Sequence, residues 1–190
     1  MLYNDPTDFS VKKEYTLSLF SENHIGLLNR ITVIFTRRKI NIESINASES
    51  EVKGVYRYTI VVNVTKPEAE KLVKQIEKLV EVLKAFMHEG SEIITQELAL
   101  YKLHINMLNQ DEPVEKIVRE CHARILAVEK DFMVIEKTGT NAETQELFKR
   151  LEKFGILEYA CSGRVAITKP MKELTTYLKE MEEKHHATKF

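Results

Sequence analysis

The chain has 190 residues, of which 43% are hydrophobic and 30% are charged, a composition typical of a globular fold with one large or two small domains. Its formal net charge of −1 provides no basic surface for nucleic acid, and no apolar run approaches the ~20 residues that span a bilayer. We therefore expect no nucleic-acid partner and no membrane partner.

The first predicted strand and helix meet at a glycine. The polar N-terminus that precedes them lacks the apolar stretch of a secretion signal, so we expect a cytoplasmic protein. Tyr15, Leu17 and Leu19 alternate with polar residues, which predicts a half-buried strand. The next segment has apolar residues at helical spacing: Leu27, Leu28, Ile31, Ile34 and Phe35. Gly26 lies between the two, where a glycine permits a tight turn and leaves the first helical N–H groups uncovered.

This junction is a candidate binding site for a free amino acid. The N-terminal end of a helix carries partial positive charge and binds carboxylate groups. Asn23 in the turn and Asn41 after the helix could place amide oxygens near the ammonium group of such a ligand. A purely structural interpretation stays open from these residues alone, in which Asn23 is a loop or capping residue and Gly26 only forms a turn.

The rest of the first unit alternates strand and helix patterns. In the extended segment after the helix, Ile42 and Ile45 are three residues apart, so they would point to opposite faces of a regular strand. This spacing favours a bulge or bend between them. Residues 56–64 form a regularly alternating strand, and residues 65–68 are a capping box with a proline that opens a helix. Residues 82–87 form the last strand. The order β-α-β-β-α-β predicts a ferredoxin-like unit, in which two helices cover one face of an antiparallel sheet.

A second unit repeats this order. Its expected strands are 99–107, 125–128, 132–138 and 156–167, and its expected helices are 113–124 and one opened by a capping box at 140–143. The loop that corresponds to the candidate site, 108–112, lacks an Asn-x-x-Gly run and carries acidic residues that would repel a carboxylate. We therefore place the ligand site in the first unit only.

The predicted fold class is α+β, with two consecutive ferredoxin-like βαββαβ units and a C-terminal amphipathic helix. The expected divisions are a polar tail (1–13), an effector-binding unit (14–88), a linker (89–97), a second unit (98–169) and a helical extension (170–190). In the extension, Met171, Leu174, Leu178 and Met181 recur every three or four residues. We expect this helix to pack on the body of the protein or on a partner.

Cysteine and histidine residues form no pattern typical of a metal site. The two cysteines, Cys121 and Cys161, are predicted to be small buried hydrophobic residues, because the sequence has no C-x-x-C spacing and no disulfide framework. His185 and His186 lie in a polar tail and are expected to be solvated.

Sequence motifs of catalysis are absent as well. The chain has no G-x-G-x-x-G, P-loop, G-x-S-x-G or H-E-x-x-H run, and its carboxylates are scattered among lysines on predicted helix surfaces. It also lacks the G-D-G…N-N type of pattern with which thiamine-diphosphate enzymes hold metal and pyrophosphate. We expect no catalytic residues, no metal site and no cofactor in this chain.

An RNA-binding RRM shares the βαββαβ order and is the alternative from another class. Its third strand carries a motif that begins with Lys or Arg followed by Gly, as Lys53-Gly54 does here. The base-stacking aromatic residues of that motif occupy the third and fifth positions, which here are Val55 and Arg57. Because the tyrosines of this strand fall on the other face and the chain has no basic surface, RNA binding is disfavoured.

Four runs of the sequence together resemble the small regulatory subunit of acetohydroxyacid synthase (acetolactate synthase). That family has E-N-x-x-G-(A/V)-L-x-R followed by N-I-E-S-(I/L), and the chain has matching runs at 22–30 and 41–45. Residues 96–103 resemble the family's R-E-L-A-L-I-K-(V/I), and residues 154–166 resemble its F-G-I-x-E-x-A-R-(S/T)-G-x-(V/I)-A. The four runs occur in the family's order.

This resemblance implies that the first unit is an ACT domain and that the chain is regulatory and not an enzyme. It would dock on the large catalytic subunit, raise its activity and confer feedback inhibition by valine in branched-chain amino-acid biosynthesis. Thiamine diphosphate and magnesium would be bound by that large subunit. ACT domains of this family pair edge to edge as a homodimer, so Asn23, Gly26 and Leu27 would face the effector carboxylate from one chain, and Asn41 and Ile42 would come from its neighbour.

Two questions stay open. The family commonly has Ala or Val after the loop glycine, and the bulkier Leu27 would alter the effector preference if its side chain points into the pocket, but not if it points into the core. A free-standing double-ACT amino-acid sensor that regulates another target would share the pocket without the synthase partner. His24 and Ile25 occupy variable positions of the family run and are interpreted as loop residues.

Overall fold

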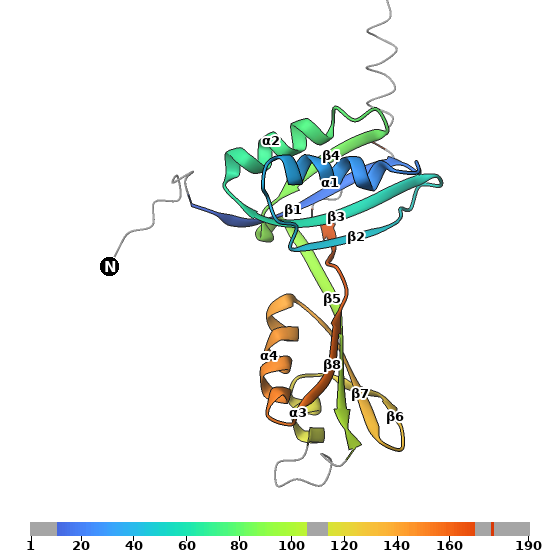
Figure 1. The fold of residues 1–190 in the computed structure, drawn as a ribbon, viewed down its shortest axis with the longest axis vertical. Coiled ribbons are helices and arrows are strands. Elements are labelled where there is room, and N and C mark those ends of the chain that lie inside the picture. The colour runs from blue at the N-terminus through green and yellow to red at the C-terminus, as the bar shows by residue number, and fades with distance from the viewer. Residues whose placement is uncertain (1–10, 106–113, 170–175, 177–190) are drawn as a thin grey trace, which may run out of the picture. The chain divides into compact units, whose positions relative to one another are not determined.

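The computed structural model of the protein describes residues 11–105, 114–169 and 176 (Figure 1). Three predicted features lie outside these residues: the N-terminal tail up to residue 10, the acidic loop at 108–112, and the C-terminal extension with its two histidines, apart from Thr176. Among the described residues, no helix has the length and apolar character needed to cross a membrane.

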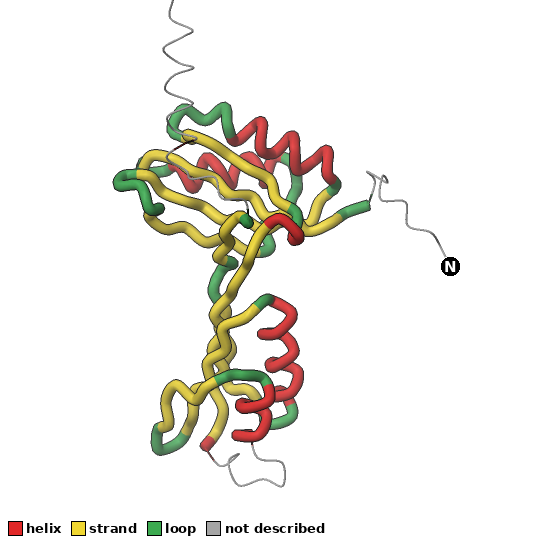
Figure 2. Tube along the Cα trace, turned by 180° about the vertical axis from the view of Figure 1, so that it is seen from behind, coloured by secondary structure: helices red, strands yellow, loops and turns green. Residues whose placement is uncertain are grey.

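The first unit has the predicted order of elements. These are β1 (Lys13–Glu22), α1 (Leu27–Arg37), β2 (Ser44–Glu49), β3 (Val55–Val64), α2 (Lys66–Ile76) and β4 (Val82–His88). The strands form an antiparallel sheet in the order β2-β3-β1-β4, so β2 and β4 are its edges. Both helices lie on the same face of the sheet (Figure 1 and Figure 2). The ferredoxin-like fold is therefore confirmed for this unit.

The core of the first unit lies between the sheet and the two helices. Strands β1 and β3 contribute Leu17, Leu19, Ile60 and Val62, all fully buried. The helices complete this cluster with Leu27, Ile31, Phe35, Ala69, Leu72 and Ile76. Because burial of one large aliphatic side chain contributes roughly 1.5–3 kcal/mol, this interface is the main source of stability in the unit.

Helix α2 begins at the predicted capping box. The Thr65 N–H donates to Glu68 Oε2 over 2.9 Å, and the Thr65 hydroxyl donates to the same oxygen. These bonds satisfy a donor that the start of the helix would otherwise leave free. They also hold the pKa of the Glu68 carboxyl below its ordinary value, because the backbone hydrogen bond, followed by the hydroxyl bond, favours the charged form.

The segment between α1 and β2 differs from the prediction. Strand β2 begins only at Ser44 and pairs with β3 in an unbroken register, without the expected bulge. Ile40 and Ile42 lie in the preceding loop and pack against the core from there. The odd spacing of Ile42 and Ile45 therefore reflects the boundary between the loop and the strand, and not a bulge.

Strand β5 (Ile93–His104) begins inside the segment that was expected to be a linker. A short 3-10 helix, η1 (Gly90–Glu92), precedes it. The division between the two units falls between Ile94 and Thr95, within the strand, and residues 166–169 also belong to the first unit. Ile93 is buried, which explains why ordered structure starts earlier than the polar composition of this segment suggested.

The second unit repeats the topology of the first. After β5 come α3 (Val114–Glu120), β6 (Arg124–Val128), β7 (Phe132–Gly139), α4 (Asn141–Glu152) and β8 (Ile156–Cys161). Strand β9 (Val165–Thr168) follows, and all of it except Val165 belongs to the first unit. The strand order is β6-β7-β5-β8, and β9 also pairs with β5. Its core contains Tyr101, Leu103, Ile117, Met133, Ile135, Leu147 and Leu151, all fully buried. The second ferredoxin-like unit is therefore confirmed.

Two details of the second unit correct the sequence prediction. The strand expected at 156–167 is two strands, because the pairing with β5 is interrupted after Cys161. Cys161 is exposed at the end of the edge strand β8, so the prediction that it is buried was wrong. Cys121 is partly buried against the core, where its sulfur accepts a hydrogen bond from Arg150 Nη1 over 3.3 Å.

Candidate effector site

The loop between β1 and α1 turns at Gly26. The φ angle of this residue is +84°, a left-handed conformation that residues with a side chain rarely adopt. A Cβ atom here would meet nothing within 4 Å, so the backbone conformation, and not crowding, requires glycine. Asn23, His24 and Ile25 are exposed, as is Gly26 itself. The loop is therefore open to a ligand from solution.

Helix α1 begins without a side-chain cap. Gly26 is the capping residue, no side chain supplies the capping hydrogen bond, and the first turn contains no acidic residue. Within the turn, the Leu27 N–H donates to the His24 carbonyl over 3.2 Å. The interpretation of Asn23 as the cap of this helix is therefore wrong. Because no carboxylate neutralises its partial positive charge, the start of α1 is suited to bind an anionic group.

The Leu27 side chain points into the core. It is fully buried in the cluster between the sheet and the helices. Leu27 thus belongs to the face of α1 that packs on the sheet. Its side chain takes no space from a ligand that binds at the loop. Of the two orientations that the sequence left open, the structure has the one into the core, and only the backbone of Leu27 faces the turn.

Asn41 and Ile42 lie beyond the opposite end of α1. The Asn41 side chain is exposed and donates through Nδ2 to Glu43 Oε1 over 3.2 Å, which leaves its amide oxygen available. Ile42 is half-buried against the core. An 11-residue helix separates them from Gly26, a length of roughly 16 Å at 1.5 Å per residue. One amino acid is too short to touch both groups of residues in a single copy of the chain.

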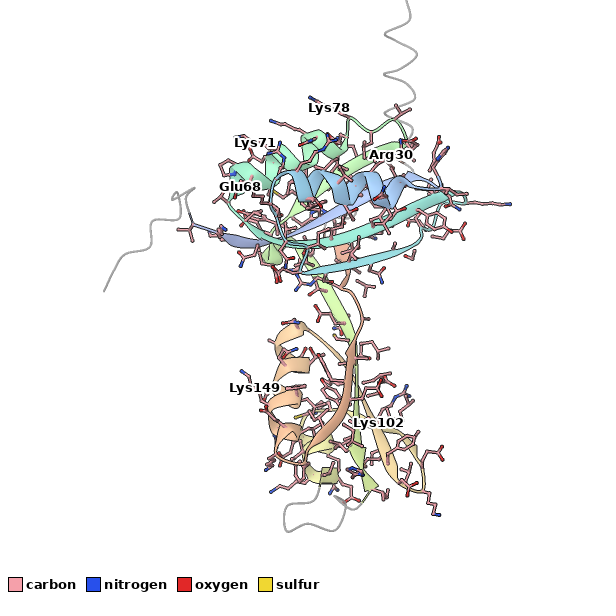
Figure 3. The ribbon with its side chains drawn as sticks, viewed as in Figure 1. Arg30, Glu68, Lys71, Lys78, Lys102 and Lys149 are labelled. Carbon is pink, nitrogen blue, oxygen red and sulfur yellow. The ribbon has the colours of Figure 1, made fainter. Side chains whose placement is uncertain are left out.

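A second loop braces the start of α1. Arg30 on α1 (Figure 3) forms an ion pair with Glu81, with Nη2 and Oε1 separated by 2.5 Å. The Glu81 carbonyl also accepts the Glu22 N–H over 3.0 Å. The hydrogen bond from Arg30 holds the pKa of the Glu81 carboxyl below its ordinary value. The positive charge of Arg30 therefore balances the negative charge that Glu81 brings close to the start of α1. Sequence reasoning missed this brace, although Arg30 ends the Glu-Asn-x-x-Gly run.

Strand β2, next to the Asn41 segment, is a free edge of the sheet. It pairs with β3 on one side, and its residues are exposed or half-buried. An edge strand presents unpaired N–H and C=O groups that can pair with another chain. Within the described residues, no cluster of His, Cys, Asp and Glu could hold a metal ion.

The first unit is ferredoxin-like, with a glycine turn and an uncapped helix start, and it is followed by a second unit of the same topology. The first unit belongs to the class of ACT domains, as the family match shows. Two family descriptions match the chain: "AHAS small subunit-like ACT domain" over residues 17–84 and "Small subunit of acetolactate synthase" over residues 96–170.

Relatives of known name agree with both matches. The acetolactate synthase small subunit of Mycolicibacterium smegmatis is 34% identical over 155 residues, which are 82% of this chain and 91% of that protein. The Bacillus subtilis protein of the same name is 34% identical over 160 residues, 84% of this chain and 91% of that protein. The chain belongs to the acetolactate synthase small-subunit family.

A solved structure shows the same fold. The crystal structure of the acetolactate synthase small subunit from Thermotoga maritima has a TM-score of 0.76 and 28% sequence identity, and the similarity covers 84% of this chain and 99% of that one. The similarity therefore extends over both units of the chain.

Proposed function

We propose that this chain docks on the large subunit of acetolactate synthase, raises the activity of that subunit and makes it sensitive to inhibition by valine. The observation that carries the proposal is the family match over both units. The match to residues 96–170 favours this role over a free-standing double-ACT sensor, because a general amino-acid sensor has no need of a second unit specific to this family.

The effector would bind between two copies of the chain. Antiparallel pairing of β2 with β2 of a second copy would join the two sheets across a two-fold axis. This arrangement brings the start of α1 in one copy toward Asn41 of the other, because the two lie at opposite ends of the same helix. It therefore accounts for the separation of roughly 16 Å that one amino acid does not bridge within a single copy.

Each part of a small aliphatic amino acid then has a partner. The effector carboxylate meets the uncapped start of α1 beyond Gly26, where the backbone N–H groups and the helix dipole favour negative charge. The Asn41 amide oxygen of the other copy accepts from the ammonium group. Ile42 supplies the adjoining apolar surface. Since Leu27 points into the core, it does not exclude a branched side chain such as that of valine.

The chemistry of the synthase would belong to the large subunit. Thiamine diphosphate and magnesium would be bound there, and this chain would contribute no catalytic residue. Its part is to bind the effector and to change the activity of its partner in the cytoplasm.

Mixing the chain with the large subunit from the same organism tests the proposal. We expect the two proteins to co-elute in size-exclusion chromatography and the synthase activity to rise above that of the large subunit alone. The small chain by itself, supplied with thiamine diphosphate, magnesium and pyruvate, should form no acetolactate above background. If both proteins are folded and neither a complex nor activation is observed, the free-standing sensor is the better description.

A further inference from the structure

Glu81 holds both ends of the effector loop, which comprises residues 23–26 between β1 and α1. Before the loop, the Glu22 N–H at the end of β1 donates to the Glu81 carbonyl over 3.0 Å. After the loop, Arg30 Nη2 lies 2.5 Å from Glu81 Oε1. The backbone and the side chain of one residue ahead of β4 therefore hold the last residue of β1 and the first turn of α1.

The Glu81 carboxylate is shielded from water. Its side chain is 14% exposed, whereas that of Arg30 is 43% exposed. Its Oε2 atom is buried and accepts no hydrogen bond from a described side chain. Since water screens such a charge less than it screens a fully exposed one, neighbouring groups feel the Glu81 charge more strongly.

Both charges of the brace act at the start of α1. The Arg30 N–H closes the first turn of the helix by donating to the Gly26 carbonyl over 3.2 Å, and the Arg30 side chain leans toward the N-terminal end, as helix side chains do. Arg30 is the main cause of the lowered pKa of the Glu81 carboxyl, and His24 of the effector loop contributes to it as well. The Glu81 charge therefore reaches the loop.

The two charges have opposite effects on an anion at this position. A carboxylate near the N-terminal end of a helix opposes the partial positive charge of that end, whereas a guanidinium adds to it. In the intact pair the two effects largely cancel. Removal of either charge leaves the other one uncompensated, and one charge at a helix end changes an equilibrium by a factor of roughly two to five.

We propose that Arg30 and Glu81 together set the electrostatic potential at the start of α1, and thereby the affinity of this end for the effector carboxylate. Arg30 strengthens binding and Glu81 weakens it, although neither touches the ligand. The link to the effector rests on the proposed function, in which the effector carboxylate binds at this position. Because the Glu81 carbonyl bonds to Glu22 independently of the side chain, the Glu81 charge can be removed without losing this hold on the loop.

A cysteine in the effector loop measures the potential without any ligand. Ile25 is 99% exposed, so Ile25→Cys places an accessible thiol beside the start of α1 in a Cys121→Ser, Cys161→Ser background. A positive potential favours the thiolate and lowers the pKa of the thiol. The pH dependence of its reaction with an uncharged thiol reagent gives the acid dissociation constant.

The two brace variants should change this constant in opposite directions. Arg30→Gln should lower it roughly two- to fivefold, and Glu81→Gln should raise it by a similar factor. The double variant should return close to the starting value. Changes in the same direction, or no change, would overturn the proposal, because the pair would then act only by holding the loop.

The ion pair between Arg124 and Glu136 in the second unit is the matched control. Arg124 Nη2 and Glu136 Oε2 are also 2.5 Å apart, and the Glu136 side chain is 13% exposed. Arg124→Gln and Glu136→Gln should therefore leave the thiol of Ile25→Cys unchanged. A response to these variants as large as the response to the brace variants would also overturn the proposal.

Calorimetric titration with valine tests the link to the effector. Arg30→Gln should weaken valine binding roughly two- to fivefold and Glu81→Gln should strengthen it by a similar factor, and both effects should shrink in about 1 M salt. Valine affinities that do not follow the thiol series would overturn this link. If the wild-type chain binds no valine, the proposed function fails at its effector, whereas the thiol series still decides whether the brace sets the potential.

Discussion

The start of α1 in the first unit differs from the start of α4 in the second, although the two units share one topology. In the second unit, α4 starts at a capping box in which the Thr140 N–H donates to Glu143 Oε2 over 2.7 Å. In the first unit, α2 has the same box at Thr65 and Glu68, whereas α1 starts at Gly26 with no side-chain cap. A capping carboxylate would occupy the place that a ligand carboxylate needs. In the proposed function, the uncapped start of α1 is therefore the feature that would bind the effector, whereas the capped starts of α2 and α4 would only support the fold.

The largest expected effect is that of Gly26→Asp on the response to valine. The new carboxylate would lie where the effector carboxylate meets the start of α1, and two like charges at one site repel each other. We expect inhibition of the reconstituted synthase to be lost while activation remains. The positive φ adds about 1 kcal/mol of strain. Effector dose-response curves for wild type and variant provide the measurement.

Gly155→Asp is the matched control for that change. Gly155 also has a positive φ, +72°, and open space at the position of a Cβ, but it follows α4 in the second unit. The Gly155→Asp change thus adds similar backbone strain and the same negative charge, but at a position away from the effector loop. Overlaying inhibition curves for Gly26→Asp and wild type would show that the site is not at the start of α1.

Asn41→Ala should weaken effector binding by a smaller amount. The change removes one hydrogen-bond acceptor of the ligand ammonium group, which costs roughly 1–3 kcal/mol of binding free energy. Calorimetric titration of the pure chain with valine, leucine and isoleucine measures both the loss and the effector preference. Equal affinities of wild type and variant would remove Asn41 from the site.

The capped helices should lose stability when their caps are removed. Thr65→Ala and Thr140→Ala should each lower the free energy of unfolding by about 1 kcal/mol, because each removes a hydroxyl that donates to the glutamate of its capping box. Urea denaturation followed by circular dichroism gives the two values.

Gly26→Ala removes no cap, and its cost of about 1 kcal/mol should come from the positive φ alone. Gly26→Ser, which supplies a potential cap, should therefore be no more stable than Gly26→Ala.

The smallest expected effect is on acid stability. Hydrogen bonds within the capping boxes lower the pKa of Glu68 and of Glu143 in the folded chain. Their stabilising contribution is complete above the ordinary pKa of a glutamate and is lost as the pH falls through the lowered folded value. Glu68→Gln and Glu143→Gln should therefore show a shallower loss of stability below about pH 4.3. Parallel stability curves for these variants and wild type would contradict the assignment.

Local patterns predicted the order of elements well. Alternation along β3, the capping boxes of α2 and α4, and the glycine turn at Gly26 depend on nearby residues, so the sequence alone revealed them. The resemblance of the four sequence runs to the family then indicated that the candidate site binds an amino acid, and it indicated which residues would form the site.

Other features depend on contacts that sequence patterns do not show. Whether Leu27 faces the core or a ligand depends on the rotation of α1 over the sheet. The brace between Arg30 and Glu81 joins residues that are far apart in the sequence. Similarly, the early start of β5 depends on the burial of Ile93, and Cys161 is exposed because β8 is an edge strand.

Calorimetry on mixed dimers tests the two-copy effector site most directly. Chains with Gly26→Asp and chains with Asn41→Ala are each titrated with valine alone, and then as a mixture that has been allowed to exchange subunits. In a mixed dimer, one pocket combines the intact Gly26 loop of one chain with the intact Asn41 segment of the other. We predict that valine sites of wild-type affinity appear in the mixture but in neither variant alone. If no such sites appear although the subunits have exchanged, the effector does not bind between two copies at the start of α1.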